Sequence, residues 1–271
     1  MRRAIPASLA LLLVAAVACW GCGGGKEPRA WLDETSQSAS RYIEDGGYLH
    51  FGEEVEYRLT TGESSVEQSI EMEGDNIFPY RQRYDYRETV ISAEMPDQPQ
   101  ENSFSYLTVD GGATAFVEGE RLTEQLGVIG WIHYTPTEEE NRFFNYPDLI
   151  KTLTSTEDEV RSLGYKEVDG TRCVHLQYKV SGEDLMRMRL QEDPSLQEKY
   201  QDVDISELFD DMEVELWIGE DDGLPRQVVM SQVILEEEQA NAEIRFHILL
   251  SGYGEEAPVQ IEQPAFFTDA M

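Results

Sequence analysis

Apolar and polar residues alternate along most of the chain after residue 48, with the period of two that is typical of β-strands. The clearest case is the segment 48–60, whose apolar side chains share odd positions: Leu49, Phe51, Val55, Tyr57 and Leu59. In the segment 80–90, tyrosines and Val90 lie on one face, and arginines, Asp85 and Thr89 lie on the other. A strand with one aromatic and one charged face belongs to an antiparallel sheet that contacts water on one side.

Turn sequences join these segments into hairpins. Asp110-Gly111 and Asp169-Gly170 are dipeptides that favour tight hairpin turns, and residues 220–225 form a third bend. We expect about ten strands in all, with residues 259–264 as the last of them. Because consecutive strands usually pair with each other, the pattern predicts one large antiparallel sheet.

Helical spacing replaces this alternation in a few places. Residues 31–43 carry apolar side chains at helical intervals, and Gly46 and Gly47 follow as a C-terminal stop. A second helix is expected over 146–153, and short helices over the Leu- and Met-rich segment 182–211, while 120–133 fits either a strand pair or a short helix. The predicted fold class is therefore α+β, with helices packed on one face of the sheet.

The first 25 residues have the layout of a bacterial lipoprotein signal. Two arginines precede an apolar run of about 15 residues, which is shorter than the roughly 20 that cross a bilayer as a helix. Small residues precede Cys19, whereas the bulky Trp20 lies close before Cys22. We therefore expect a signal peptide over 1–18 and lipidation of Cys19, with Cys22 as the alternative.

Lipidation places the protein at the cell membrane, on its extracytoplasmic face. Residues 19–29 would form the lipidated flexible tether, and residues 30–271 a single domain. An ordinary secreted protein with two chance cysteines is the alternative interpretation of the same segment.

The charge of the chain excludes one class of partner. There are 54 acidic and 21 basic residues, which give a net charge of −33. A surface this negative repels phosphate backbones, so we expect no nucleic-acid partner. It also repels anionic lipid headgroups within about 8 Å, the screening length at physiological salt, so acyl chains rather than charge would hold the protein at the membrane.

The sequence lacks the motifs of the common enzyme classes. Its four histidines are far apart and show no metal-ligand spacing, and no GxSxG nucleophile motif is present. Cys173 lies in an alternating segment, which predicts a buried free thiol. We therefore expect no catalytic residues, no metal and no cofactor; a secreted hydrolase of unrecognised type is a remote alternative.

Two hairpin motifs in the second half carry a family resemblance. They are Val168-Asp169-Gly170 with His175 and Tyr178, and Trp217-Ile218 with Gly223-Leu224-Pro225-Arg226. In their order and spacing they resemble the LppX/LprAFG lipoproteins, which are relatives of the LolA and LolB carriers. The resemblance implies a strongly curved antiparallel sheet, a half-barrel, with helices on its concave face and an apolar cavity between them. Members of this family bind or move lipids and lipoproteins in the cell envelope.

The expected function is that of a membrane-anchored envelope lipoprotein that binds a hydrophobic ligand, a lipid or a lipid-linked molecule, for carriage or sensing. The alternative is a ligand-free interaction or sensory lipoprotein that contacts another envelope protein. Candidate cavity residues are the apolar side chains of the helical segments, since methionine and leucine line adaptable pockets. They are Phe143, Phe144, Leu149, Ile150, Leu153, Leu185, Met186, Met188 and Leu190.

Overall fold

The computed structural model describes most of the chain after residue 25. The described residues are 26–61, 64–78, 81–110, 114–120, 127, 129–135, 145–156, 158–183, 210–237, 240–257 and 261–269. The elements, in chain order, are α2 (Pro28–Glu44), β1 (Tyr48–Thr61), β2 (Ser64–Ile77), β3 (Arg81–Ser92), β4 (Gln100–Val109), β5 (Thr114–Glu118), β6 (Trp131–Tyr134), α4 (Tyr146–Thr154), β7 (Arg161–Val168), β8 (Thr171–Val180), β9 (Met212–Gly219), β10 (Pro225–Glu237), β11 (Ala240–Ser251) and β12 (Phe267–Asp269).

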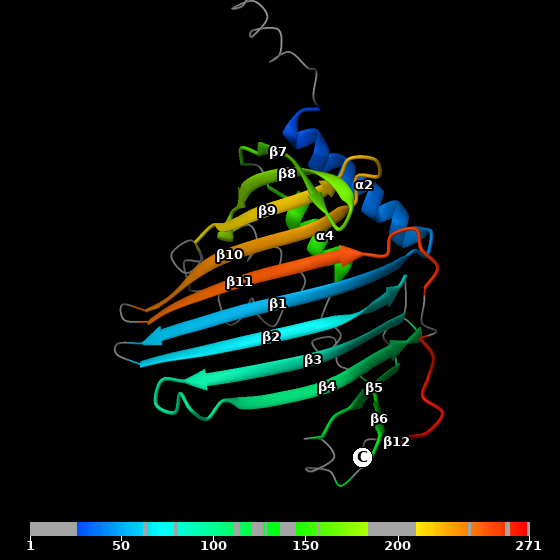
Figure 1. The fold of residues 1–271 in the computed structure, drawn as a ribbon, viewed down its shortest axis with the longest axis vertical. Coiled ribbons are helices and arrows are strands. Elements are labelled where there is room, and N and C mark those ends of the chain that lie inside the picture. Colours follow the sequence, from blue (N-terminus) through cyan, green and yellow to red (C-terminus); the bar gives the residue numbers. More distant parts are fainter. Residues whose placement is uncertain are drawn as a thin grey trace, which may run out of the picture.

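All the described strands belong to one sheet, in the order β12-β6-β5-β4-β3-β2-β1-β11-β10-β9-β8-β7 (Figure 1). Every neighbouring pair is antiparallel except β6 and β12, which run parallel. The predicted antiparallel sheet is thus confirmed. One pair near its centre is non-local, because β1 pairs with β11 from His50 to Thr61 as well as with β2.

The predicted hairpin turns are confirmed, and the strand count is higher than expected. β4 pairs with β5, β7 with β8, and β9 with β10 across the predicted turns. Asp169 and Gly170 have φ values of 45° and 73°, the left-handed conformation that such a two-residue turn requires. The structure has twelve strands among its described residues, because β6 and β12 are too short for alternation to reveal them.

The position of the last strand was predicted wrongly. Residues 261–264 lie outside any strand, and the chain instead ends its sheet with β12. Ile261 is buried in a small cluster with Leu107, Val109 and Phe116. Residue 261 is therefore apolar because its side chain packs against the sheet, although the residue belongs to no strand.

The helices at 31–43 and 146–153 are confirmed as α2 and α4. Gly46, with a φ of 76°, and Gly47 donate backbone hydrogen bonds to the carbonyls of Ile43 and Tyr42, which ends α2. The side chain of Asn145 accepts a hydrogen bond from the backbone N–H of Asp148 at 3.2 Å and so caps α4. Nearly all of the predicted helical segment 182–211 lies outside the described residues.

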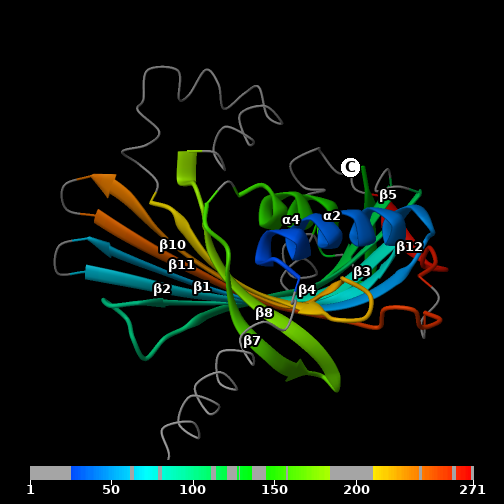
Figure 2. The same ribbon diagram turned by 90° about the horizontal axis from the view of Figure 1, so that it is seen from above.

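Both helices lie on one side of the sheet, within its bend (Figure 2). We call this side the inner face and the opposite side the outer face. The inner face carries the main core, in which Leu32 of α2 and Leu153 of α4 are fully buried against Leu49 and Phe51 of β1 and their neighbours. This arrangement confirms the predicted fold class, a large curved antiparallel sheet with helices on its concave face.

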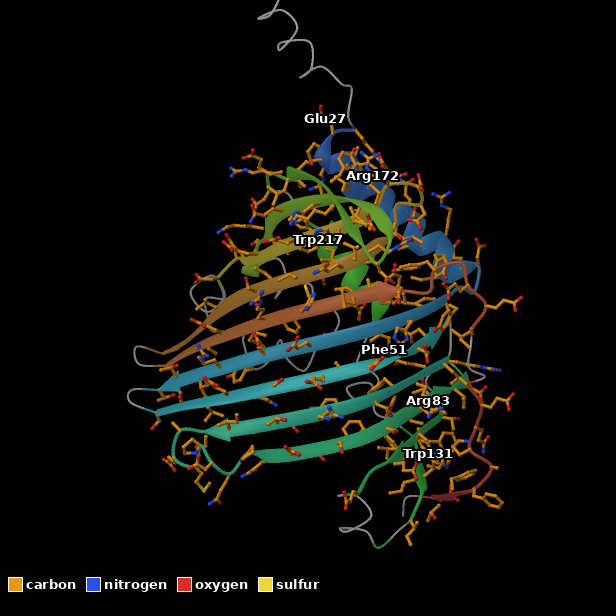
Figure 3. All side chains as sticks on the ribbon, in the orientation of Figure 1. Glu27, Phe51, Arg83, Trp131, Arg172 and Trp217 are labelled. Carbon is orange, nitrogen blue, oxygen red and sulfur yellow. The ribbon has the colours of Figure 1, made fainter. Side chains whose placement is uncertain are left out.

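The outer face is polar over the central strands. Because strand side chains alternate, Glu54, Glu56 and Arg58 of β1 point away from the helices. Figure 3 shows charged side chains spread over this face.

Cys173 is buried and is a free thiol, as its alternating segment predicts. None of the described helices has the length and apolar character that a membrane span requires.

Candidate ligand-binding face

The inner face stays apolar beyond the core. Val55 of β1 pairs with Ile70 of β2 and Phe246 of β11, and the next inner position, Tyr57, pairs with Ile244 of β11. All five side chains are half-buried. Within the described part of the chain, α2 and α4 cover the sheet nearer the start of β1, and neither helix extends over the end of the strand (Figure 2). The sheet therefore continues its apolar surface past its helical cover.

A single carboxyl group interrupts this surface. Glu53 lies on the inner face between Phe51 and Val55, and its cross-strand partners are Met72 of β2 and Ile248 of β11. No described residue hydrogen-bonds or pairs with its carboxyl group. Burial raises the pKa of Glu53 from 4.5 to about 7, because an apolar environment disfavours the ionised form. Near neutral pH this group exchanges between a neutral hydrogen-bond donor and an anion.

Polar and aromatic side chains border the same face on β2, β3 and β4. The Nε2 of Gln68 donates a hydrogen bond to the Oε1 of Glu88 at 2.6 Å. The ring of Tyr86 stacks on that of Phe104, with their centroids 4.5 Å apart. The inner face is thus mostly apolar along β1 and β11. Towards β3 it carries polar side chains beside the apolar ones, and these form its polar border.

Buried tyrosines hold the helices over this face. Tyr178 of β8 donates a hydrogen bond from its hydroxyl to the carbonyl of Leu153, at the end of α4, at 2.7 Å. Tyr253 donates to the hydroxyl of Tyr146, at the start of α4, at 3.0 Å. Burial raises the pKa of Tyr178 well above its usual value, and the same cause raises that of Tyr253. Both ends of α4 are therefore attached to the sheet or to its C-terminal extension.

The Gly223-Leu224-Pro225-Arg226 motif serves this same assembly. Gly223, with a φ of 70°, lies where an added Cβ would crowd Glu34 and Ser38 of α2, so the β9–β10 turn packs directly on that helix. Arg226 forms an ion pair with Asp222, and its guanidinium lies 4.4 Å from the ring centroid of Tyr253. The Gly-Leu-Pro-Arg turn is thus a structural contact between the sheet and its helices.

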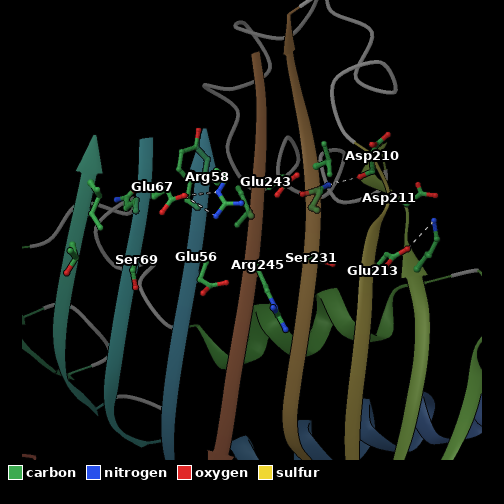
Figure 4. Close-up of a pocket in the computed structure, with 18 residues that line it drawn as sticks. Glu56, Arg58, Glu67, Ser69, Asp210, Asp211, Glu213, Ser231, Glu243 and Arg245 are labelled. Atoms are coloured by element: carbon green, nitrogen blue, oxygen red, sulfur yellow. Dashed lines mark hydrogen bonds and ion pairs between the residues drawn. The ribbon is translucent and has the colours of Figure 1, made fainter. Parts of the chain in front are cut away.

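The outer face carries a groove of about 720 Å³ at the end of the sheet where β1 finishes (Figure 4). Arg58 donates from Nε to the Oε1 of Glu67 at 3.0 Å, and the Nζ of Lys179 lies 3.8 Å from the Oε1 of Glu213. The residues that line it include six acidic and three basic side chains. An acidic, ion-paired lining of this kind suits water and cations better than acyl chains.

A second groove, of about 1060 Å³, lies on the outer face between the central strands and the tip of the β7–β8 hairpin at Val168 and Asp169. His50 contacts Asp75 there, with Nδ1 and Oδ1 3.0 Å apart. The described residues contain no group of three or more His, Cys, Asp and Glu side chains that could hold a metal ion. Both grooves differ in character from the inner face, which is the candidate binding surface.

The predicted cavity residues divide into two groups. Ile150 and Leu153 are buried in the core between α4 and the sheet, and Leu149 packs against that core. Phe143 and Phe144, the four candidates Leu185, Met186, Met188 and Leu190, and the two cysteines Cys19 and Cys22 lie outside the described residues. For the first group the structure shows a packed position beside the part of the inner face that α2 and α4 do not cover. A role in ligand binding stays a prediction for both groups.

Sequence reasoning missed Glu53 as a site residue. The odd positions from 49 to 59 are otherwise apolar, so a glutamate in that series was visible as an exception in the sequence itself. What the series does not show is that both neighbouring strands also place apolar side chains beside it.

Comparisons with known proteins find similarity at the level of the fold. No family model matches the chain, and a comparison with curated proteins finds no matching sequence. Among solved structures, LprF from Mycobacterium bovis is similar, with 14% identity, a TM-score of 0.47, and 88% of this chain and 97% of that chain covered. Lipoprotein LppX from Mycobacterium tuberculosis is also similar, with 11% identity, a TM-score of 0.40, and coverage of 86% and 98%. At these identities the similarity is one of fold alone.

Proposed function

We propose that this protein is a membrane-anchored envelope lipoprotein that binds a hydrophobic ligand, a lipid or a lipid-linked molecule, on the inner face of its sheet. The observation that carries the proposal is the continuation of the apolar inner face through Val55, Tyr57 and Phe246 beyond the helices. Burying about 300 Å² of acyl chain on such a surface contributes about 7 kcal/mol, which offsets much of the cost of leaving a bilayer.

The anchor supports this proposal through geometry. With Cys19 lipidated, residues 19–27 extend over at most about 30 Å before α2 begins. That reach keeps the sheet near the membrane surface, while the net charge of −33 opposes flat contact with anionic headgroups. A tethered domain of this kind meets membrane lipids often without being part of the bilayer.

The test is lipid analysis of the full chain with both Cys19→Ser and Cys22→Ser, so that the anchor itself contributes no acyl chains. We expect solvent extraction of the purified protein, followed by mass spectrometry, to yield a bound apolar molecule. Adding Val55→Glu on the inner face should remove that molecule. The matched control is Val233→Glu, a half-buried valine on the outer face of β10, which should retain it.

A folded protein that carries no lipid, and that takes up none from mixed vesicles, would contradict the proposal. That result would favour the ligand-free interaction lipoprotein instead. Equal loss of lipid in the two glutamate variants would show that destabilisation, rather than the inner face, controls the binding.

A further inference from the structure

The inner face contains one feature that a purely apolar binding surface does not need, the carboxyl group of Glu53. Its neighbours along β1 are Phe51 and Val55, and its neighbours across the strands are Met72 and Ile248. A carboxyl group placed among apolar side chains lowers stability unless a partner satisfies it. No described residue supplies that partner, and the side chain of Glu53 is only half-buried, so its carboxyl group can meet a molecule that binds on this face.

We propose that Glu53 selects the polar group of the ligand: its carboxyl group donates a hydrogen bond to the carbonyl oxygen of an ester in a molecule whose hydrocarbon part lies on the inner face. This inference rests on the proposed function, because it specifies the chemistry of the ligand that the inner face binds. It assigns the class of neutral acyl esters rather than hydrocarbons or charged amphiphiles.

The surroundings of Glu53 favour a neutral ligand over a cationic one. An ammonium group has three N–H donors, and Met72 and Ile248 offer no strong acceptor for those that Glu53 leaves free. Burying an ion pair also costs the desolvation of both charges. An uncharged oxygen needs only the one donor that a protonated carboxyl group supplies.

Other titratable groups on this face are farther away in the sheet. The inner positions of β2 and β11 opposite and beside Glu53 carry no ionisable side chain. On β3, Tyr86 lies beyond Met72, and Glu88 lies beyond Ile70 and accepts a hydrogen bond from Gln68. On α4, Tyr146 is buried with a raised pKa, and both Asp148 and Lys151 are exposed.

Burial is the cause that raises the pKa of Glu53 to about 7, so the donor form is populated at neutral pH and lost above it. Binding of a neutral oxygen should therefore weaken as pH rises through 7. For a ligand that requires the protonated form, linkage predicts an affinity about 30-fold lower at pH 8.5 than at pH 6. A ligand with no oxygen should show a smaller dependence, because it gains no hydrogen bond from the protonated form.

The experiment measures equilibrium binding of three probes to the full chain with Cys19→Ser and Cys22→Ser, delivered from a cyclodextrin carrier. The probes are trioleoylglycerol, whose oxygens all belong to esters and donate no hydrogen bond, squalane, which has no oxygen, and oleylamine, which is cationic. We expect trioleoylglycerol to bind about 30-fold more weakly at pH 8.5 than at pH 6, and squalane to change less than this.

Three variants test whether the carboxyl group of Glu53 itself controls binding. Glu53→Gln keeps a donor that does not titrate, so it should retain tight trioleoylglycerol binding at both pH values. Glu53→Leu should weaken trioleoylglycerol binding at pH 6 about tenfold and should not weaken squalane binding. Glu54→Gln, at the adjacent outer-face position, is the matched control and should behave as the parent protein.

Two results would overturn the inference while leaving the proposed function intact. One is pH-independent trioleoylglycerol binding that Glu53→Leu does not change. The other is oleylamine as the tightest probe, with affinity rising with pH, which would assign a cationic ligand. Failure of all three probes to bind the folded parent protein would instead contradict the proposed function itself.

Discussion

The imidazole of His175 lies flat on the indole of Trp217, with the two ring centroids 4.1 Å apart and the planes 11° from parallel. The two residues are register partners on β8 and β9. The Nε2 of His175 lies 2.8 Å from the Oε2 of Glu215, and the Nζ of Lys166 lies 5.6 Å from the indole centroid. Both of these motif residues therefore build the outer side of the sheet edge, not the inner face.

This stack predicts a specific acid sensitivity. Burial lowers the pKa of His175 below 6.5, so the unfolded chain takes up the proton at a higher pH than the folded one. The stability that neutral His175 confers is present above pH 6.5 and is lost as pH falls through the folded pKa. His175→Phe keeps an aromatic ring on Trp217 and should reduce the loss of urea-unfolding free energy between pH 7.5 and pH 5. Equal losses in the two proteins would contradict this.

Glu53 predicts the opposite pH dependence. Its folded pKa of about 7 lies above the ordinary value of 4.5, so the folded state holds a proton that the unfolded state has released. The stability that this proton confers is fully present below pH 4.5 and is lost as pH rises to about 7. Glu53→Gln should therefore unfold at the same urea concentration as the parent at pH 4 and be up to about 3 kcal/mol more stable at pH 8. No gain at pH 8 would show that the carboxyl group is solvated.

We predict that the hydrogen bond from Tyr178 to the carbonyl of Leu153 contributes measurably to holding α4 on the sheet. Tyr178→Phe removes the donor and leaves the buried Leu153 carbonyl without it, which should lower the free energy of unfolding by about 2 kcal/mol. Tyr165→Phe, an exposed tyrosine on β7, is the control and should change it by less than about 0.5 kcal/mol. Urea titration followed by circular dichroism gives both values, and similar effects in the two variants would contradict the prediction.

Gly74 lies at a position on the inner face that has no room for a larger side chain. An added Cβ there would overlap the carbonyl oxygen of Arg83 and the Cβ of Tyr84, whose ring packs 6.3 Å from that of Phe51. Gly74→Ala should therefore lower the free energy of unfolding by about 2 kcal/mol or more. Gly52→Ala, on β1 with open space around the added atom, is the matched control and should leave the unfolding midpoint nearly unchanged.

Local patterns predicted the elements well, for identifiable physical reasons. Alternation along 48–60 places Phe51 and Val55 on one face, and the structure confirms that face as the one the helices cover. The Asp169-Gly170 turn is confirmed because few residues adopt two successive positive φ angles. β12 was not predicted, and β6 was expected only under the strand-pair alternative for residues 120–133, because three or four residues are too few to show a period.

The candidate site could be predicted only in part. Leu149, Ile150 and Leu153 were chosen for their helical spacing, and the structure places them in or against the core, beside the part of the inner face that α2 and α4 do not cover. The apolar surface around Glu53, by contrast, comes from β2 and β11, which are far apart in the sequence. Nothing local to residue 53 indicates which strands will lie on either side of it.

By itself, the sequence determined the alternation of the strands, the tight turns and the ends of the two helices, because each depends on side chains and backbone angles within a few residues. The tertiary structure alone decided that β1 lies between β2 and β11, and hence that Met72 and Ile248 surround the carboxyl group of Glu53. The physical reason is that backbone hydrogen bonds along a strand edge are the same for every partner. The choice of partner therefore depends on how all the strands and helices pack together.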